Sequence, residues 1–242
     1  MQFRHLLKSQ LRRLGYDMHR YLPVSVPAAQ MKTILSARNI NLVLDVGANE
    51  GQFGLELRDL GYTGWIVSFE PLASAHALLL EKARKDVAWQ VLERMALGAE
   101  DGEIDIHVSG NSVSSSVLPM LDSHLASAPG SAYVGVERVP LRRLDSVALS
   151  WFEMEPRALL KIDTQGFEDR VLEGASGLID KVDAVQLELS LTMLYSGQKL
   201  FVDMIQSMAT LGFDLWAAWP VFVDPGTGRC LQMDATFVRS AR

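Results

Sequence analysis

The sequence predicts an α/β protein whose core is a mostly parallel β-sheet with helices on both faces. From residue 42 onward, short apolar runs alternate with segments of helical periodicity, which is the pattern of βαβ units. The chain has 242 residues, of which 48% are hydrophobic and 21% charged, an ordinary composition for one domain with a substantial core. We therefore expect one catalytic-size domain with about seven core strands.

The individual elements follow from these patterns in chain order. Strands are expected at residues 42–47, 65–71, 89–97 and 183–190, with an additional strand at 102–109. Two further segments, 133–147 and 158–175, should each begin as a strand and continue as a helix. Helices are expected up to about Leu60 and over residues 73–84 and 199–211. The last two strands, 213–222 and 231–239, are joined by a turn too short for a crossover helix, so the last strand should be antiparallel.

The N-terminal segment predicts a basic amphipathic helix. Apolar residues recur at helical spacing opposite basic residues, at Phe3, Leu7, Leu11, Leu14 and Met18 against Lys8, Arg12 and Arg13. The favoured interpretation is a helix that packs on the main domain or on a dimer partner, with an interfacial membrane helix as the alternative. Residues 22–27, with two prolines, read as a linker, so we divide the chain into an N-terminal helix and linker (1–27) and a domain (28–242).

Charge and cysteine content exclude several classes. The net charge of -6 argues against a nucleic-acid-binding protein that works through a broadly basic surface. The single cysteine, Cys230, excludes an internal disulfide and a multi-cysteine metal cage, and it fits a reducing compartment, by default the cytoplasm. No run of about 18 apolar residues is present, so we expect no transmembrane span.

The first strand leads into a turn, VLDVGANEGQFG, that should hold a ligand at the edge of the sheet. A dinucleotide site would need glycine where this chain has Asn49, between Gly47 and Gly51. Asp45 sharpens the choice, because two unit charges about 4 Å apart interact by about 4 kcal/mol at an effective dielectric constant near 20. Asp45 would therefore repel a pyrophosphate and attract an ammonium group.

The second strand ends at Glu70, a carboxylate able to accept both hydroxyls of an unphosphorylated ribose. An adenosine that carries an amino-acid tail would satisfy Glu70 through its ribose and Asp45 through its ammonium group. S-adenosylmethionine is such a molecule, and we expect it to be the cofactor.

Four stretches of the chain resemble the FkbM family of S-adenosylmethionine-dependent methyltransferases. They are LVLDVGANEGQFG, VSFEP, MALGAEDGEIDIHVS with SVSSSVL, and LLKIDTQGFEDRVLEGA followed by VQLELS. The resemblance covers residues 42–239, and K-I-D-x-Q-G-x-E is its most specific part. It implies a class I (Rossmann-like) methyltransferase fold, a seven-stranded sheet with an antiparallel last strand, and methyl transfer to a hydroxyl of a sugar or secondary metabolite. The chain departs from the common signature at Thr164, where valine is usual, and at Phe167, where a small residue is usual.

The resemblance and the turn together define the expected cofactor-binding residues, with adenine near Arg94 and the residues after it. The expected set is Asp45, Gly47, Ala48, Asn49, Gly51, Glu70, Pro71, Met95, Ala96 and Asp163.

The expected catalytic residues are Asp163, Gln165 and Glu188, near the ends of neighbouring strands. Methyl transfer requires alignment of the acceptor oxygen and removal of its proton, and Asp163 is the first candidate for that base. Asp163 and Glu188 could bracket the acceptor hydroxyl with one shared proton, or, as a minority interpretation, hold Mg²⁺. Lys161 is expected to form a structural ion pair with one of these acids. Glu168 begins the next helix, where its carboxylate either interacts favourably with the helix dipole or takes part in the site.

Other polar and aromatic residues leave alternatives open. His124 is a candidate base but would more often be a solvated side chain, and His107 is the other histidine able to reach the site. The serine-rich segment 110–118 is either a lid near the ligands or a flexible surface loop. Three late aromatics, Tyr195, Trp216 and Trp219, either line the acceptor pocket or belong to the core.

The leading hypothesis is an O-methyltransferase that acts on a small-molecule or glycan acceptor. The basic N-terminal helix favours an acceptor on a lipid, glycan or carrier protein. The alternatives are a nicotinamide-dependent oxidoreductase and a non-catalytic binding module with a methyltransferase fold. The sequence leaves the acceptor and a homodimer as open questions.

Overall fold

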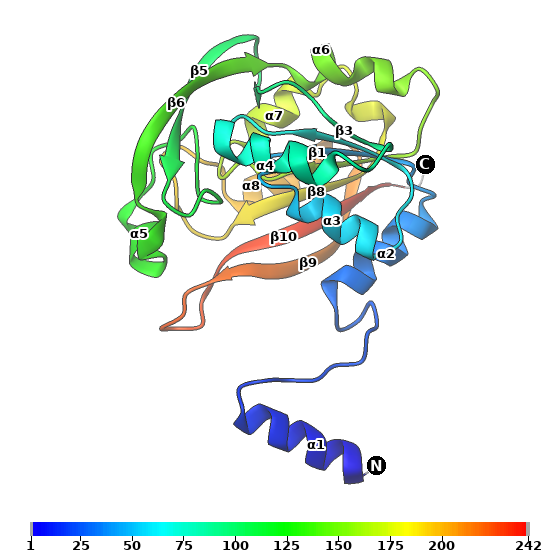
Figure 1. Ribbon diagram of the computed structural model, residues 1–242, viewed down its shortest axis with the longest axis vertical. Helices are drawn as coiled ribbons and strands as arrows, with labels where there is room; N and C mark the ends of the chain where they lie inside the picture. Colours follow the sequence, from blue (N-terminus) through cyan, green and yellow to red (C-terminus); the bar gives the residue numbers. More distant parts are fainter. Residues whose placement is uncertain (1, 241–242) are drawn as a thin grey trace.

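A seven-stranded β-sheet with helices on both faces forms the centre of the protein (Figure 1). The computed structural model describes residues 2–240, and for residues 2–6 only the backbone. The strand order across the sheet is β3 (Trp89–Val91), β2 (Trp65–Phe69), β1 (Leu42–Val46), β7 (Ala158–Ile162), β8 (Val182–Ser190), β10 (Cys230–Arg239) and β9 (Phe213–Val223). The predicted α/β class is confirmed.

Strand directions also match the expectation. The pairs β1–β2, β1–β7, β2–β3 and β7–β8 are parallel, whereas β10 is antiparallel to both β8 and β9. The last strand is therefore inserted between β8 and β9. Because β1 lies between β2 and β7, the strand order reverses there, and the carboxyl ends of these three strands border the place where such sheets bind ligands.

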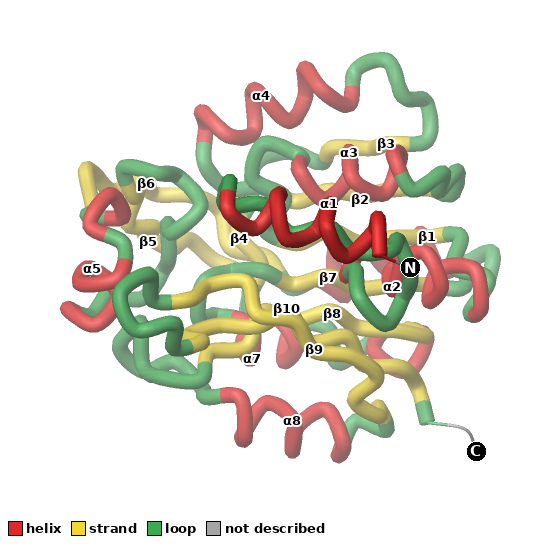
Figure 2. Tube along the Cα trace, turned by 90° about the horizontal axis from the view of Figure 1, so that it is seen from below, coloured by secondary structure: helices red, strands yellow, loops and turns green. Residues whose placement is uncertain are grey.

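Two apolar layers cover the sheet, and alternate strand residues supply them. Leu42, Leu44 and Val46 of β1 belong to one cluster with residues of α6 (Leu144–Ala148), α7 (Glu168–Gly174) and α8 (Phe201–Thr210). Val43 belongs to a second cluster with residues of α2 (Pro27–Ala37), α3 (Gln52–Asp59) and α4 (Ala73–Ala83). Figure 2 shows α3 and α4 on one side of the sheet and α8 on the other.

A second, three-stranded sheet was not anticipated. It contains β4 (Ala96–Leu97), β6 (Tyr133–Arg142) and β5 (Gly102–Ser109), with β5 antiparallel to β6. The single strand expected over residues 89–97 is in fact β3 and β4, one in each sheet. The polar residues Glu93 and Arg94 interrupt that apolar run, and the chain changes sheets there. Helix α5 (Asp122–Ser127) precedes β6.

The N-terminal region differs from the expectation in three respects. Helix α1 spans Gln2–Arg13, so Leu14 and Met18 lie beyond it, and Gly15 follows its end with φ +82°. A second helix, α2, begins with Pro27 at its first turn, where the sequence analysis expected only the end of a linker. Figure 1 shows α1 apart from the domain, joined to it by residues 14–26, instead of packed on it. Among residues 2–240, none of the helices has the length and apolarity needed to cross a bilayer.

Candidate active site

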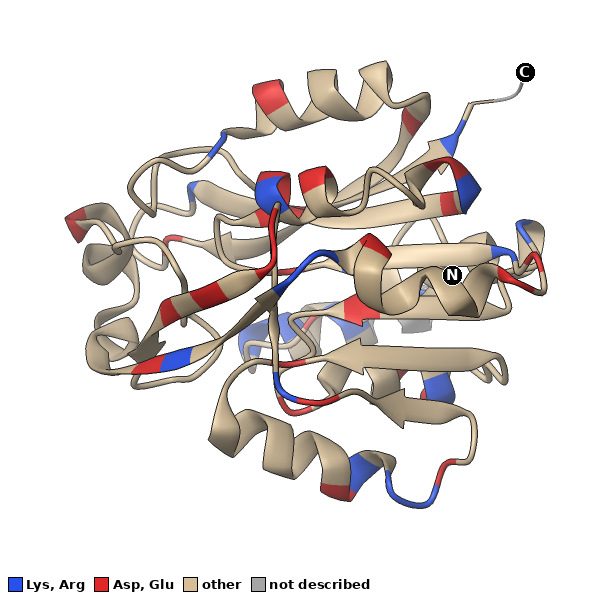
Figure 3. Cartoon of the chain, turned by 90° about the horizontal axis from the view of Figure 1, so that it is seen from above, with Lys and Arg blue, Asp and Glu red and all other residues tan. Residues whose placement is uncertain are grey.

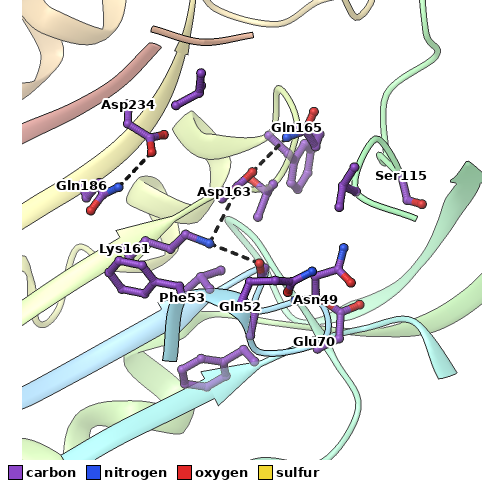
Figure 4. A pocket seen from close by; sticks show the side chains of 18 of the residues that line it. Asn49, Gln52, Phe53, Glu70, Ser115, Lys161, Asp163, Gln165, Gln186 and Asp234 are labelled. Carbon is purple, nitrogen blue, oxygen red and sulfur yellow. Dashed lines mark hydrogen bonds and ion pairs between the residues drawn. The ribbon is translucent and has the colours of Figure 1, made fainter. Parts of the chain in front are cut away.

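A cavity of about 440 Å³ lies at the carboxyl ends of β1, β2 and β7 (Figure 4). Its wall includes the turn after β1, the residues after β2 and β7, part of the serine-rich segment, and side chains of α2, α3, β8, β9 and β10. A volume of this size is within the range of small-molecule and cofactor sites. The cavity is thus at the ligand position expected for this topology.

Glycine is required in the turn after β1. Gly47 has φ +73°, and a Cβ atom there would lie 1.9 Å from the backbone oxygen of Asp163. The turns after β1 and β7 can approach each other only without a side chain at this position. Gly47, Ala48 and Asn49 line the cavity, whereas Gly51 precedes α3 and packs beneath the turn against Leu79.

Asp45 does not line the cavity. Its side chain is fully buried, with one carboxylate oxygen 3.4 Å from Lys161 Nζ and the other accepting a hydrogen bond from Ser68 Oγ at 3.3 Å. Burial raises the pKa of Asp45, and the nearby Lys161 ammonium opposes that rise. The cation that Asp45 was expected to attract is thus present within the protein, as Lys161.

Lys161 links the turns after β1 and β7. Its ammonium group lies 3.4 Å from Asp163 Oδ2, donates a hydrogen bond to the Gly47 carbonyl at 3.3 Å, and lies 5.6 Å from the ring centroid of Phe53. Burial alone would lower the pKa of Lys161, but Asp163, Asp45 and Asp234 together raise it above its ordinary value. The predicted structural ion pair is confirmed, and it joins two acids instead of one.

Glu70 lines the cavity together with Pro71, and its side chain is buried. Its Oε2 accepts a hydrogen bond from the Asn49 N–H and its Oε1 one from the Leu72 N–H, both at 2.8 Å. Burial raises the pKa of Glu70 to about 7, against the opposing effect of these two hydrogen bonds. Each oxygen keeps a second lone pair able to accept a ligand hydroxyl.

An apolar wall adjoins Glu70. Met95, Ala96 and Leu97 line the cavity there, with Ile106 and Val117 of the second sheet and serine-rich segment. This wall is suited to pack against the face of a flat aromatic ring such as adenine. Arg94 takes no part in it, because its guanidinium donates to the Pro71 carbonyl at 3.1 Å and pairs with Glu137 at 2.7 Å.

Gln165 separates the two acids that were expected to act together. Its Nε2 donates to Asp163 Oδ1 at 2.9 Å and to Glu188 Oε2 at 2.7 Å, and its backbone φ is +56°. Asp163 and Gln165 line the cavity, whereas Glu188 lies behind them and also accepts from Gln232 Nε2 at 2.6 Å. Burial raises the pKa of Glu188 well above its ordinary value. The Gln165 amide thus lies between Asp163 and Glu188, where a proton shared directly by the two carboxylates was expected.

The minority interpretation of a Mg²⁺ site gains no support. Within the described part of the chain, no three His, Cys, Asp or Glu side chains are grouped as ligands for a metal ion. The polar groups around Asp163 are instead an ammonium and an amide, which donate hydrogen bonds and cannot coordinate a cation through those nitrogens.

Glu168 holds the turn that carries Gln165. Its Oε1 accepts hydrogen bonds from the backbone N–H groups of Thr164 at 2.9 Å and Gly166 at 3.1 Å. Burial raises the pKa of Glu168 to about 7. Thr164 and Phe167, the two departures from the family signature, both line the cavity.

The serine-rich segment forms part of the cavity wall. Residues 112, 113 and 115–117 line it, and Ser116 Oγ donates to the Gln165 carbonyl at 2.7 Å. Tyr195 supports the same residue from the core, since its buried hydroxyl lies 2.9 Å from Gln165 Oε1 and 3.1 Å from the Ser114 carbonyl. Tyr195 was expected in the pocket or the core, and its contact with Gln165 was not predicted.

Neither histidine candidate lines the cavity. His124 is buried, with Nε2 3.2 Å from Ser131 Oγ, and burial lowers its pKa. His124 is therefore not the solvated side chain that is usual for a lone histidine, and it does not reach the cavity as a base would have to. His107 stacks on Tyr133 at a centroid distance of 4.8 Å.

Of the residues that line the half of the cavity beyond Lys161, only Trp219 was predicted as a pocket residue. Polar and aromatic side chains line it, namely Gln30, Gln52, Phe53, Glu56, Gln186, Trp219, Asp234 and Thr236. Gln186 Nε2 donates to Asp234 Oδ2 at 3.1 Å, while Gln186 Oε1 is buried without a partner. Trp219 donates its indole N–H to Gln30, whereas Trp216 is exposed and lies outside the cavity lining. Gln186, a polar residue within the apolar strand VQLELS, was the sequence feature that could have indicated this part of the cavity.

Comparison with known proteins gives one family match. The sequence profile of the methyltransferase FkbM domain matches residues 45–215. No curated protein sequence matches the chain.

Solved structures with a similar arrangement include three methyltransferases. The precorrin-6y C5,15-methyltransferase from Geobacter metallireducens is 11% identical with a TM-score of 0.44, over 87% of this chain and 88% of that one. The TehB-like SAM-dependent methyltransferase from Corynebacterium glutamicum is 10% identical with a TM-score of 0.44, over 99% and 97% of the two chains. The rRNA methylase from Streptococcus thermophilus is 9% identical with a TM-score of 0.46, over 90% and 99%.

Proposed function

Because the chain belongs to the FkbM family of S-adenosylmethionine-dependent methyltransferases, we propose that it methylates a hydroxyl oxygen of a sugar, glycan or secondary metabolite. The observation that carries the proposal is the position of Asp163. This signature residue lines the cavity, and 34% of its side chain is exposed. Glu70 lines the same cavity, so a proton acceptor and a nucleoside-binding acid share one cavity.

The half of the cavity around Glu70 fits S-adenosylmethionine. The Glu70 carboxylate is available to the ribose hydroxyls, the wall of Met95, Ala96 and Leu97 to the adenine, and the turn residues Gly47 and Ala48, which line the cavity, to the amino-acid tail. When bound, this cofactor supplies a methyl group attached to a positively charged sulfur atom. Pro71, Asn49 and the Asp163 side of the cavity complete the expected contacts.

The half beyond Lys161 fits a hydroxylated acceptor. Amide and carboxylate groups of Gln52, Glu56, Gln186 and Asp234 can accept or donate hydrogen bonds with several hydroxyls, and the ring of Trp219 can pack against C–H groups. The unpartnered Oε1 of Gln186 is a buried acceptor that such a hydroxyl would satisfy. This combination favours a polyhydroxylated molecule over an apolar one.

Asp163 is the residue we assign as general base. When the acceptor oxygen forms its bond to the methyl carbon, its proton must leave, and the Asp163 carboxylate can take it. Lys161 and Gln165 hold the two carboxylate oxygens in place, and Glu188 and Tyr195 in turn hold Gln165. Glu188 is thus a positioning residue in this proposal.

Transfer of a labelled methyl group from S-adenosylmethionine to a panel of monosaccharides, glycans and hydroxylated metabolites tests the proposal. Amines and RNA serve as competing acceptor classes. Asp163→Asn should lower kcat by about 100-fold or more, the typical contribution of a general base, while the donor Kd stays within about threefold. Asp203→Asn, an exposed change on α8, is the matched control. Label on nitrogen or on RNA, or equal turnover by Asp163→Asn, would refute the assignment.

A further inference from the structure

The N-terminal segment differs in charge from the rest of the chain. Residues 1–26 contain five of the 23 Lys and Arg residues and one of the 29 Asp and Glu residues, so they carry a formal charge of +4 and the remainder -10. Over the domain, basic positions are interspersed with acidic ones in the view of Figure 3. The single acid of the segment, Asp17, is already paired with Arg12 at 3.1 Å.

The same segment exposes a series of large apolar side chains. Their exposed fractions are 40% for Leu7, 72% for Leu14, 70% for Tyr16, 37% for Met18, 60% for Tyr21, 40% for Leu22 and 84% for Val24. They begin on α1 and continue into residues 14–24, which form neither helix nor strand. In Figure 1 α1 stands apart from the domain, so the domain does not cover this surface.

We propose that residues 2–26 bind the surface of an anionic lipid bilayer. Basic side chains beside exposed apolar and tyrosine side chains are the composition of segments that lie in the interface of such membranes. The interface accepts apolar side chains from a helix and from irregular backbone alike, since water there still satisfies the peptide groups. A protein partner that recognises one helix face would leave the apolar residues after Gly15 uncovered.

This binding would hold the cavity near the membrane. Pro27, the first residue of α2, lines the cavity, so the segment enters the domain at the cavity wall. The connection over residues 14–26 can span at most about 45 Å when fully extended. Val113 and Val221, two lining residues, are exposed by 52% and 49%. An acceptor carried on a lipid would then be within reach of the cavity. This extension rests on the proposed function, whereas the membrane binding does not.

Flotation of the full-length protein with phosphatidylcholine vesicles that contain or lack phosphatidylglycerol tests the binding. We expect the protein to float only with the anionic vesicles and to be released by high salt. The combined variant Lys8→Gln, Arg12→Gln, Arg13→Gln should bind on the order of 100-fold more weakly, given the usual contribution of each basic residue near such a surface. Leu7→Ser with Leu14→Ser should also abolish flotation.

A matched variant removes the same charge from the domain, through Arg84→Gln, Lys85→Gln and Lys181→Gln at exposed positions, and should float like the wild type. Absence of flotation by the wild type, or an equal loss in the domain variant, would overturn the proposal. So would a dimer in sedimentation that Leu7→Ser with Leu14→Ser dissociates while flotation persists. S-adenosylmethionine binding in the absence of vesicles, which these variants should retain, separates this test from that of the methyltransferase activity.

Discussion

Replacement of Lys161 by methionine tests the ion pair beneath the cavity. Lys161 Nζ lies 3.4 Å from a carboxylate oxygen of Asp45, and Asp45 is fully buried. At that distance and an effective dielectric constant near 20, the attraction is about 5 kcal/mol. The pairing with Asp163 adds less, because that carboxylate is partly exposed and solvent screens it. Loss of one partner of a buried pair typically costs about 3–5 kcal/mol, and we expect Lys161→Met to lose that much.

The loss should depend on pH. Burial raises the pKa of Asp45, and without Lys161 nothing of comparable size opposes the rise. A carboxyl whose pKa is higher in the folded protein than in the unfolded chain takes up a proton on folding. Its contribution to stability is therefore greatest below the unfolded pKa and declines as the pH rises through the folded pKa. The deficit of Lys161→Met relative to the wild type should accordingly be larger at pH 7 than at pH 5.

Urea unfolding followed by tryptophan fluorescence at both pH values measures these effects. In the double variant Lys161→Met, Asp45→Asn, the uncompensated charge is absent, so at least about 2 kcal/mol should be regained. Lys85→Met, at an exposed position, is the control and should change the free energy of unfolding by less than about 0.5 kcal/mol. The reasoning fails if Lys161→Met costs less than about 1 kcal/mol, or if the double variant is no more stable than the single one.

Two further predictions concern the cavity wall. Glu70→Gln should weaken S-adenosylmethionine binding by about 10- to 100-fold in calorimetry, because hydrogen bonds to a charged acceptor are lost. Since burial raises the pKa of Glu70 to about 7, wild-type affinity should fall from pH 8 to pH 6 and that of the variant should not; identical pH profiles would contradict the ribose assignment. Gly47→Ala should cost at least about 3 kcal/mol of unfolding free energy, because its Cβ would lie 1.9 Å from the Asp163 carbonyl. Gly228→Ala, with φ +72° but open space, should cost only about 1–2 kcal/mol, and equal losses would show that the clash is relieved elsewhere.

Much of the fold could be predicted, because hydrophobic periodicity reports which faces of an element are buried. The alternation after Leu42 predicted the central strands, and the short turn after β9 predicted the antiparallel β10. The division of residues 89–97 between two sheets was missed, because strands of three and two residues are too short to show a period, although Glu93 and Arg94 interrupt the run between them. Helix α2 was missed although Pro27 and the spacing of Met31, Ile34 and Leu35 were available as signals.

The candidate site was predicted unevenly. Glu70, Asp163 and Gln165 line the cavity, as expected for polar residues that follow parallel strands. Asp45 and Glu188 lie behind its wall, because side-chain burial depends on neighbouring strands and not on the position of a residue along its own strand.

By itself, the sequence determined the sheet, the glycine-containing turn after the first strand, and the acids at the strand ends, because burial periodicity, backbone conformation and charge are properties of short segments. Only the tertiary structure decided which charges meet. In the strand register, Asp45 of β1 stands beside Lys161 of β7, and Lys161 beside Gln186 of β8, residues distant in the chain. Lys161 of β7 thus neutralises Asp45 of β1. The polar groups that line the cavity are those that this pairing leaves available.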